Sequence, residues 1–120
     1  MNPNNPTGSY DTSEELDEIN RLCVRHKFAL ISDVVFFDYL LNPNDREGVS
    51  LVNNSATATY VLNGLSKNLA LPQMKLSWIV TSGPKIDVDE SLKRLEMIAD
   101  SFLSVNTPVQ NSLASWLSVR

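Results

Sequence analysis

Apolar residues recur at helical spacing in three stretches of the chain, and each stretch predicts an amphipathic helix. The first lies between residues 12 and 27, the second covers residues 88–103, and the third begins at residue 107. Their apolar positions are Leu16, Ile19, Leu22 and Cys23 in the first, Val88, Leu92, Leu95, Ala99, Phe102 and Leu103 in the second, and Val109, Leu113, Trp116 and Leu117 in the third. We interpret these faces as core or partner surface that carries no chemistry of its own.

Residues at two of these boundaries indicate where helices begin. Thr12 and Glu15 have the spacing of a capping box, in which each side chain accepts from the other residue's backbone N–H. Thr107 before Pro108 indicates another start, with the threonine as N-cap and the proline at the first helical position. His26, the only histidine, falls in the basic last turn of the first helix. We therefore interpret it as a helix-end residue and not as a base or metal ligand.

Three apolar runs predict strands. Phe28–Ile31 contains no polar residue, which favours a parallel strand buried on both faces and ending at Ser32-Asp33. Thr57–Leu62 is the next predicted strand, and Leu76–Thr81 is a third that ends before Gly83-Pro84. Together with the helices, these runs predict the α/β class.

Turn-forming residues dominate two segments. Met1–Gly8 contains two Asn-Pro pairs, and each proline biases the residue before it towards an extended or turn conformation. Either Asn-Pro bond is a candidate for the cis form. The alternative interpretation is a floppy N-terminal loop. Leu41–Ser55, rich in Asn, Asp, Gly and Pro, is predicted to be a surface loop.

The composition is that of an ordinary soluble domain, with 42% hydrophobic and 20% charged residues among 120. A net charge of −4 argues against a nucleic-acid surface, and no apolar run is long enough to span a membrane. The single cysteine, Cys23, cannot form an internal disulfide and is expected to pack as a small apolar residue. This fits a reducing compartment, so we expect a cytoplasmic protein.

The candidate chemistry centres on Lys67, which follows the Thr57–Leu62 strand within the turn Gly64-Leu65-Ser66-Lys67. We expect this lysine in a short loop just past a buried strand, where α/β proteins bind their ligands. A partly desolvated lysine can act there as a nucleophilic amine and form a Schiff base. A serine-lysine pair after a strand does not by itself identify such an amine.

Two further polar residues are expected near Lys67. Asp33 is followed by apolar residues, so its carboxylate needs a partner; a turn or helix-capping aspartate is the alternative. Asn5 lies in the turn cluster before the first helix, where a preceding strand would end. Because the ends of parallel strands lie side by side, an amide, a carboxylate and an amine could meet in one crevice. Such a crevice suits a ligand with a carbonyl, a hydrogen-bond acceptor and a basic nitrogen.

Three motifs in this order resemble those of class I/II aminotransferases, the pyridoxal-phosphate enzymes of fold type I. They are Asn-Pro-Asn-Asn-Pro-Thr-Gly at residues 2–8, Ser-Asp-Val-Val-Phe-Phe-Asp-Tyr at residues 32–39, and Gly-Leu-Ser-Lys at residues 64–67 with a basic residue eight positions later. The resemblance covers nearly the whole chain. It implies that residues 1–120 are part of the large, cofactor-binding domain, a partial three-layer sandwich with a mostly parallel sheet and flanking helices. The small domain is expected to be absent.

The resemblance also implies roles for single residues. Lys67 would hold pyridoxal 5'-phosphate as a Schiff base and move the proton at the substrate's α-carbon. Asp33 would pair with the protonated pyridine nitrogen, which keeps the ring an electron sink. Asn5, beside a cis Asn5-Pro6 bond, would donate to the phenolic oxygen. Ser66 and Lys75 would bind the phosphate.

Two cofactor-binding positions depart from the family's usual pattern. Phe36 stands where a tyrosine usually donates to the phenolic oxygen, and Tyr39, three residues later, is not assumed to replace it. Loss of that donor should favour the protonated Schiff base and raise its pKa. Lys75 stands where arginine is usual, which keeps the charge but loses the two-pronged hydrogen bonding. We therefore expect weaker phosphate binding.

The function that the resemblance implies is transfer of an amino group between an amino acid and a 2-oxo acid by a homodimeric parent enzyme. We expect the present residues to be an internal segment that is inactive alone, because buried strands would be left with open edges. A C–S lyase, or another fold type I reaction that uses the same Lys67, Asp33 and Asn5, is one alternative. A non-catalytic fragment that binds no cofactor productively is the other.

Overall fold

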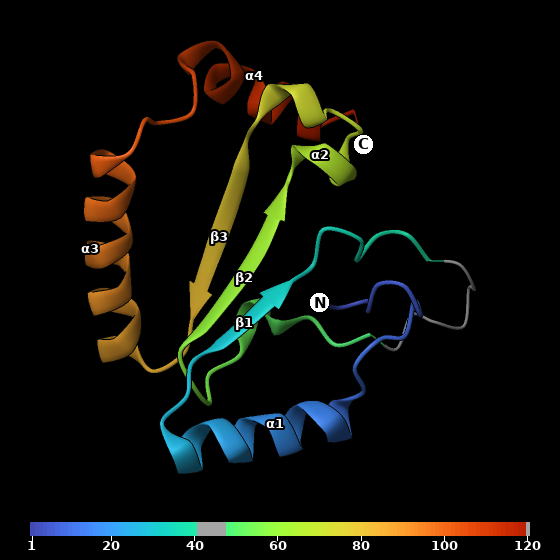
Figure 1. The fold of residues 1–120 in the computed structure, drawn as a ribbon, viewed down its shortest axis with the longest axis vertical. Coiled ribbons are helices and arrows are strands. Elements are labelled where there is room, and N and C mark those ends of the chain that lie inside the picture. The colour runs from blue at the N-terminus through green and yellow to red at the C-terminus, as the bar shows by residue number, and fades with distance from the viewer. Residues whose placement is uncertain (41–47, 120) are drawn as a thin grey trace.

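The computed structural model describes residues 1–40 and 48–119, which form a three-stranded sheet with helices around it (Figure 1). The strands are β1 (Leu30–Asp33), β2 (Thr59–Gly64) and β3 (Ser77–Ser82), in the order β1-β2-β3. The helices are α1 (Ser13–His26), α2 (Leu65–Asn68), α3 (Lys85–Ser101) and α4 (Thr107–Leu117), and 3-10 turns are η2 (Leu51–Asn53) and η3 (Pro72–Met74). The predicted α/β class is confirmed.

The sheet is mixed. β1 and β2 run parallel, as predicted, with Asp33 opposite Leu62. β3 runs antiparallel to β2, so the expected mostly parallel sheet is limited here to the first pair. The reason lies in the connection between β2 and β3. The N–H of Leu65 donates to the carbonyl of Leu76 at 3.0 Å, so β3 begins at the same end of the sheet where β2 ends. A parallel neighbour would instead need a crossover to the opposite end.

β1 is shorter and more exposed than its apolar run predicted. Phe28 precedes the strand and Ile31 faces solvent, with exposed fractions of 60% and 66%. The opposite face, with Ser32, is buried against the cluster that includes Val61. The prediction of burial on both faces is therefore wrong for this chain.

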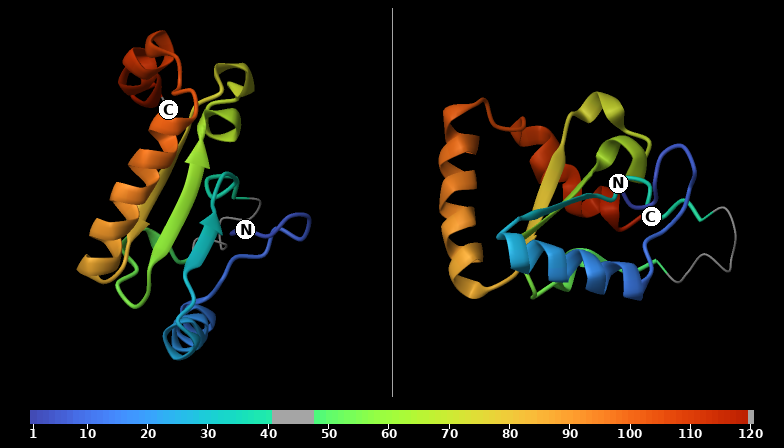
Figure 2. Two further views of the ribbon diagram at one scale, coloured as in Figure 1. Left: turned by 60° about the vertical axis from the view of Figure 1, so that its left-hand side comes forward. Right: turned by 60° about the horizontal axis from the view of Figure 1, so that its bottom comes forward.

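α3 runs along one side of the sheet and α1 lies beyond the start of β1, as the left view of Figure 2 shows. α3 reaches the sheet at Tyr60 of β2, whose hydroxyl lies 2.6 Å from that of Ser91. It does not extend over the edge strand β1, which leaves Ile31 uncovered.

Two core clusters hold the elements together. One consists of Val34, Leu51 and Val61, and Leu16 of α1 packs against it. The other consists of Leu65, Leu76 and Val109, with Trp78 and Trp116 among the residues around it. Because Leu65 is fully buried at the start of α2, the second cluster anchors the helix that carries Lys67. Cys23 is buried, as expected.

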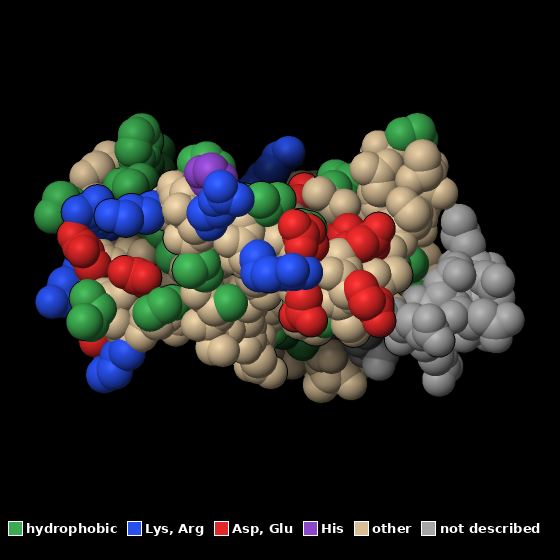
Figure 3. All heavy atoms as spheres, turned by 90° about the horizontal axis from the view of Figure 1, so that it is seen from below, with side chains coloured by type: hydrophobic (Ala, Val, Ile, Leu, Met, Phe, Trp, Pro, Cys, Tyr) green, Lys and Arg blue, Asp and Glu red, His purple; other side chains and the backbone are tan. Residues whose placement is uncertain are grey.

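α1 begins and ends as the sequence predicted. Its capping box is present, since Thr12 Oγ1 accepts from the N–H of Glu15 at 3.2 Å and a carboxylate oxygen of Glu15 accepts from the N–H of Thr12 at 2.9 Å. His26 lies in the last turn, next to the left-handed C-cap Lys27. Figure 3 shows acidic side chains towards one end of this helix and basic ones towards the other, the distribution that the helix dipole favours.

The boundaries of α3 and α4 differ from those predicted. α3 begins three residues earlier than predicted and ends before Phe102 and Leu103, which are exposed. The N-cap of α4 is Asn106, whose side-chain oxygen accepts from the N–H of Val109 at 3.1 Å. The prediction of Thr107 is therefore wrong by one residue. Asparagine and threonine both cap well, and proline is accepted anywhere in the first turn because those N–H groups have no helical partner.

The first turn-rich segment, Met1–Gly8, is fixed by two cis bonds and by hydrogen bonds of Asn2. Both Asn2-Pro3 and Asn5-Pro6 are cis, as the Asn-Pro pairs allowed. Asn2 is buried, its N–H donates to the carbonyl of Asp33 at 2.9 Å, and its side chain bonds to Asp11 and Val49. The floppy-loop alternative is therefore wrong.

Part of the second segment, residues 41–47, lies outside the described residues. Within the rest, Leu51 of η2 is buried in the core with 4% of its surface exposed. The predicted surface loop is therefore wrong at this turn.

Candidate active site

The site is built where β1 and β2 end side by side. Asp33 is the last residue of β1, and the next residue, Val34, donates its N–H to the carbonyl of Leu62 at 3.0 Å. β2 continues to Gly64 and passes directly into α2. Figure 1 shows both strand tips pointing to the same edge of the sheet, with α2 beyond β2 and the N-terminus beside β1.

Lys67 lies in the single-turn helix α2 and not in the short loop that was predicted. The buried Leu65 fixes this turn because its carbonyl accepts from the N–H groups of both Leu69 and Leu71, at 3.2 and 3.1 Å. Ala70 then takes a left-handed conformation, with φ of 54°, after the helix has ended. The side chain of Lys67 is thus exposed on a turn whose first residue is anchored in the core.

The amine of Lys67 lies over an aromatic ring. Its Nζ is 5.8 Å from the ring centroid of Phe36, within the range of a cation–π contact. Tyr39 packs edge-on against Phe36 at a centroid distance of 5.8 Å, and its hydroxyl donates to the carbonyl of Lys67 at 2.5 Å. A second bond joins the same two segments, from Asn68 Nδ2 to a carboxylate oxygen of Asp38 at 3.3 Å.

Asp33 is half-buried, and its Oδ1 accepts from the N–H of Val35 at 3.1 Å. This is the turn aspartate that the sequence offered as an alternative. Among residues 1–40 and 48–119, Asp33 and Lys67 form no ion pair with each other; the ion pairs are Glu18–Arg21, Lys85–Asp89 and Glu90–Arg94.

Asn5 lies in the turn that follows the first cis bond, and its side chain is exposed. Asn2 ties this turn to the end of β1 through its bond to Asp33. Sequence reasoning missed Asn2, although the repeated Asn-Pro pair could have drawn attention to it. The turn that carries Asn5 is therefore tied to the carboxyl end of β1 through Asn2, and among the described residues no hydrogen bond joins the Asn5 side chain to Asp33 or Lys67.

Ser66 and Lys75 each neighbour one partner of the Leu65–Leu76 backbone bond, which brings the two ends of this connection together. Ser66 is half-buried on α2. Lys75 is exposed and left-handed, with φ of 52°, at the end of η3. The Ser66 hydroxyl and the Lys75 ammonium group therefore belong to the two ends of the connection between β2 and β3, which the Leu65–Leu76 bond joins.

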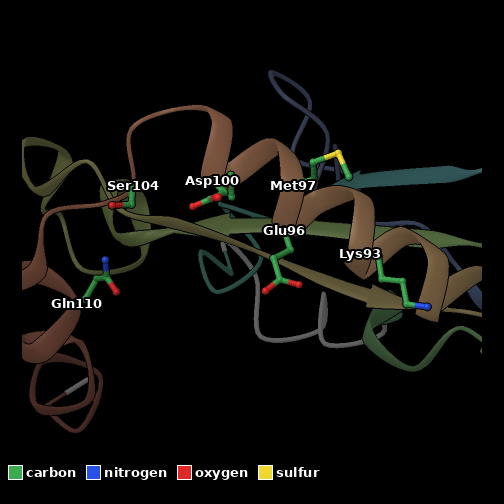
Figure 4. A pocket seen from close by; sticks show the side chains of 7 residues that line it. Lys93, Glu96, Met97, Asp100, Ser104 and Gln110 are labelled. Carbon is green, nitrogen blue, oxygen red and sulfur yellow. The ribbon is translucent and has the colours of Figure 1, made fainter.

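A separate hollow of about 900 Å³ lies along α3 and reaches α4 (Figure 4). Its lining includes Lys93, Glu96, Asp100 and Gln110 and none of Asn5, Asp33, Phe36, Ser66, Lys67 and Lys75. In Figure 4, Lys93 and Gln110 stand at opposite ends of the view and do not converge on one point. The hollow therefore lacks the concentrated chemistry of the strand-end site.

Two kinds of feature are absent from the described part of the chain. Residues 1–40 and 48–119 contain no cluster of three or more His, Cys, Asp or Glu suited to a metal ion. No helix within these ranges is long and apolar enough to cross a membrane.

Comparison with known proteins identifies the family. The family description "Aminotransferase class I and II" matches residues 1–120. The chain belongs to this family. Glutamate-pyruvate aminotransferase AlaA of Escherichia coli K12 is 30% identical to it over 118 residues, and an alanine aminotransferase of Mycobacterium tuberculosis is 27% identical over 114 residues.

Solved aminotransferase structures share the fold. An aminotransferase from Escherichia coli superposes with a TM-score of 0.77 at 30% identity, covering 95% of this chain and 28% of that one. Alanine aminotransferase from Pyrococcus furiosus gives a TM-score of 0.68 at 30% identity over 91% of this chain and 27% of that one. The mixed sheet with flanking helices is thus part of a fold type I domain.

The match covers most of this chain but only part of its relatives. It takes in 98% of this chain and 29% of the Escherichia coli AlaA protein, and 94% of this chain and 26% of the Mycobacterium tuberculosis protein. The chain therefore spans less than a third of these curated relatives.

Proposed function

We propose that the protein to which this segment belongs is a pyridoxal-phosphate-dependent aminotransferase, with Lys67 as the residue that holds the cofactor. Family membership over residues 1–120 supports the reaction class. The observation that carries the assignment of Lys67 is its amine over the ring of Phe36, at the strand edge where Asp33 ends β1.

The residues present fit this cofactor chemically. Pyridoxal phosphate offers an aldehyde, a pyridine nitrogen, a phenolic oxygen and a phosphate. The matching groups are the Lys67 amine, the Asp33 carboxylate, the Asn5 amide and, for the phosphate, Ser66 with Lys75. Lys67 and Lys75 are exposed and take no part in the three ion pairs named above, so both remain available to a ligand.

The cofactor, when bound, supplies an electron sink that stabilises negative charge at the substrate's α-carbon. Asp33 would keep a proton on the pyridine nitrogen by accepting a hydrogen bond from it. Lys67 would take the proton from the substrate's α-carbon and deliver it to the cofactor carbon derived from the aldehyde, acting first as a general base and then as a general acid through the same amine. Asn5 would orient the ring through its phenolic oxygen.

The substrates are inferred from the relatives. Their names specify glutamate, pyruvate and alanine, so we propose an amino acid and a 2-oxo acid of this small class as donor and acceptor. The C–S lyase and the non-catalytic alternative each lack an observation in their favour. A homodimer in the cytoplasm remains part of the proposal, since it follows from the family resemblance and from the reducing compartment that fits the single cysteine.

The direct test is to label Lys67 with the cofactor. The full-length protein is incubated with pyridoxal phosphate and reduced with borohydride, which fixes an amine–aldehyde adduct, and the modified peptide is found by mass spectrometry. We expect one stoichiometric adduct, on Lys67, and alanine formation from glutamate and pyruvate. Lys93, exposed on α3, serves as the control lysine in the same digest.

Substitution completes this test. Lys67→Arg should abolish both adduct and turnover, whereas Lys93→Arg should change neither. An adduct distributed equally over the exposed lysines would contradict the assignment of Lys67. A Lys67 adduct with elimination of a sulfur leaving group, and without amino transfer, would favour the C–S lyase.

A further inference from the structure

The carbonyl of Lys67 has a partner from outside its own helix. A helix leaves its last four carbonyls without intrahelical partners, and α2 is only four residues long. Its Leu65 carbonyl is used by Leu69 and Leu71, and the Lys67 carbonyl accepts from the Tyr39 hydroxyl at 2.5 Å. Tyr39 therefore holds the backbone of the residue that carries the amine.

The same tyrosine also supports the surface on which that amine rests. Its ring packs edge-on against Phe36 at 5.8 Å, with an interplanar angle of 86°, and the Lys67 Nζ lies 5.8 Å from the centroid of that Phe36 ring. Tyr39 thus contacts both the ring beneath the amine and the backbone behind it. The adjacent bond between Asp38 and Asn68 joins the same two segments and strengthens this arrangement.

We infer that Tyr39 is a positioning residue for Lys67, acting through the Lys67 carbonyl and the Phe36 ring. The inference deepens the proposed function, because it concerns the residue that would hold the cofactor. Loss of the hydroxyl frees the last turn of α2 while leaving both rings in place. The Lys67 amine then samples more orientations and spends less time over Phe36.

The test compares Tyr39→Phe with the matched control Tyr60→Phe in the full-length protein. Tyr60 also loses one hydroxyl bond, to Ser91 of α3, but lies at the other end of β2. Cofactor-free protein is treated with formaldehyde and cyanoborohydride, and the methylation rate of each lysine is followed by peptide mass spectrometry. We expect Lys67 to react about 2- to 5-fold faster in Tyr39→Phe, with Lys93 unchanged, and neither to change in Tyr60→Phe.

The cofactor-loaded protein gives an independent readout. In Tyr39→Phe we expect kcat to fall about 3- to 10-fold with KM within 2-fold of the wild type, because positioning affects the chemical step more than substrate binding. Unchanged Lys67 labelling would overturn the inference. So would faster labelling of all lysines together with a lower Tm, which would show general loosening. If the wild type takes up no cofactor, the proposed function fails, and the labelling comparison still decides the role of Tyr39.

Discussion

At the scale of single residues, the strand-end site combines an exposed amine, an aromatic ring and a turn aspartate. Phe36 can support the Lys67 amine through its ring face but cannot donate a hydrogen bond. The phenolic hydroxyl that is present, on Tyr39, donates to backbone. Phe36 therefore stands where the family resemblance implies a donor to the cofactor's phenolic oxyanion, and a prediction follows from that proposal.

Phe36→Tyr should restore that donor. The cofactor-bound full-length protein is titrated with pH while its absorbance band is followed. The midpoint of the absorbance change should lie about one pH unit lower in the variant. A donor to the phenolic oxyanion favours the deprotonated Schiff-base nitrogen and so lowers the pKa of the Schiff base. Phe28→Tyr, at an exposed position before β1, is the control and should leave the transition where it is. A transition that does not fall in Phe36→Tyr would contradict the proposed contact.

Lys75→Arg should strengthen phosphate binding. A guanidinium group can donate two hydrogen bonds to one phosphate, where an ammonium acts as a point charge. We expect the Kd for pyridoxal phosphate to fall about 3- to 10-fold, measured by fluorescence titration of cofactor-free protein. Lys93→Arg, the same exchange on α3, should leave it unchanged. An equal Kd in all three proteins would mean that Lys75 does not reach the phosphate.

At the scale of elements, hydrogen bonds from capping side chains fix the starts of α1 and α4. Thr12 and Glu15 fix the start of α1 reciprocally. At α4 the sequence offers two adjacent candidates, and the side chain of Asn106 makes the bond to Val109. α4 matters to the site because Val109 belongs to the cluster that anchors Leu65 beneath α2.

Asn106→Ala should loosen α4 more than Thr107→Ala. Loss of an N-cap costs about 1 kcal/mol, which is about a 5-fold change in local opening. Hydrogen exchange of the first-turn amides of α4, measured by mass spectrometry on the full-length protein, should therefore speed up about 5-fold in Asn106→Ala. Thr107→Ala should stay within about 2-fold of the wild type. The reverse order would restore Thr107 as the cap.

At the scale of the whole molecule, the chain has more surface than a compact protein of its mass. Its accessible surface is 8550 Å², against about 6500 Å² for a compact monomer of 13.4 kDa. Its radius of gyration is 15.6 Å, against about 13.6 Å expected for 120 residues. Large apolar residues contribute to this surface, among them Phe28, Ile31, Ile79, Phe102 and Leu103.

The 120 residues expressed alone should therefore self-associate. Large apolar side chains exposed together favour association with other molecules. Sedimentation velocity should show species larger than 13.4 kDa, and the double variant Phe102→Ser, Leu103→Ser should shift the distribution towards the monomer. The matched variant Ser101→Ala, Ser104→Ala, at neighbouring exposed positions, should not. A wild-type chain that sediments only as a monomer would contradict this prediction.

The sequence alone determined those features that depend on neighbouring residues. It predicted the α1 capping box, the cis Asn5-Pro6 bond, the parallel β1–β2 pair and the family, because caps, turns and short motifs are local. It also predicted that Asp33 and Lys67 follow adjacent strands. The N-cap of α4, which it misplaced by one residue, is a choice between two residues of nearly equal capping preference.

The tertiary structure alone decided what depends on distant partners. Burial of Leu51 and exposure of Ile31 follow from which elements cover each sheet face, and no local pattern contains that information. The direction of β3 follows from the closed Leu65–Leu76 connection. Only the fold shows that Tyr39, 28 residues before Lys67 in the chain, donates to its carbonyl, because a hydrogen bond between two segments requires that both be placed first.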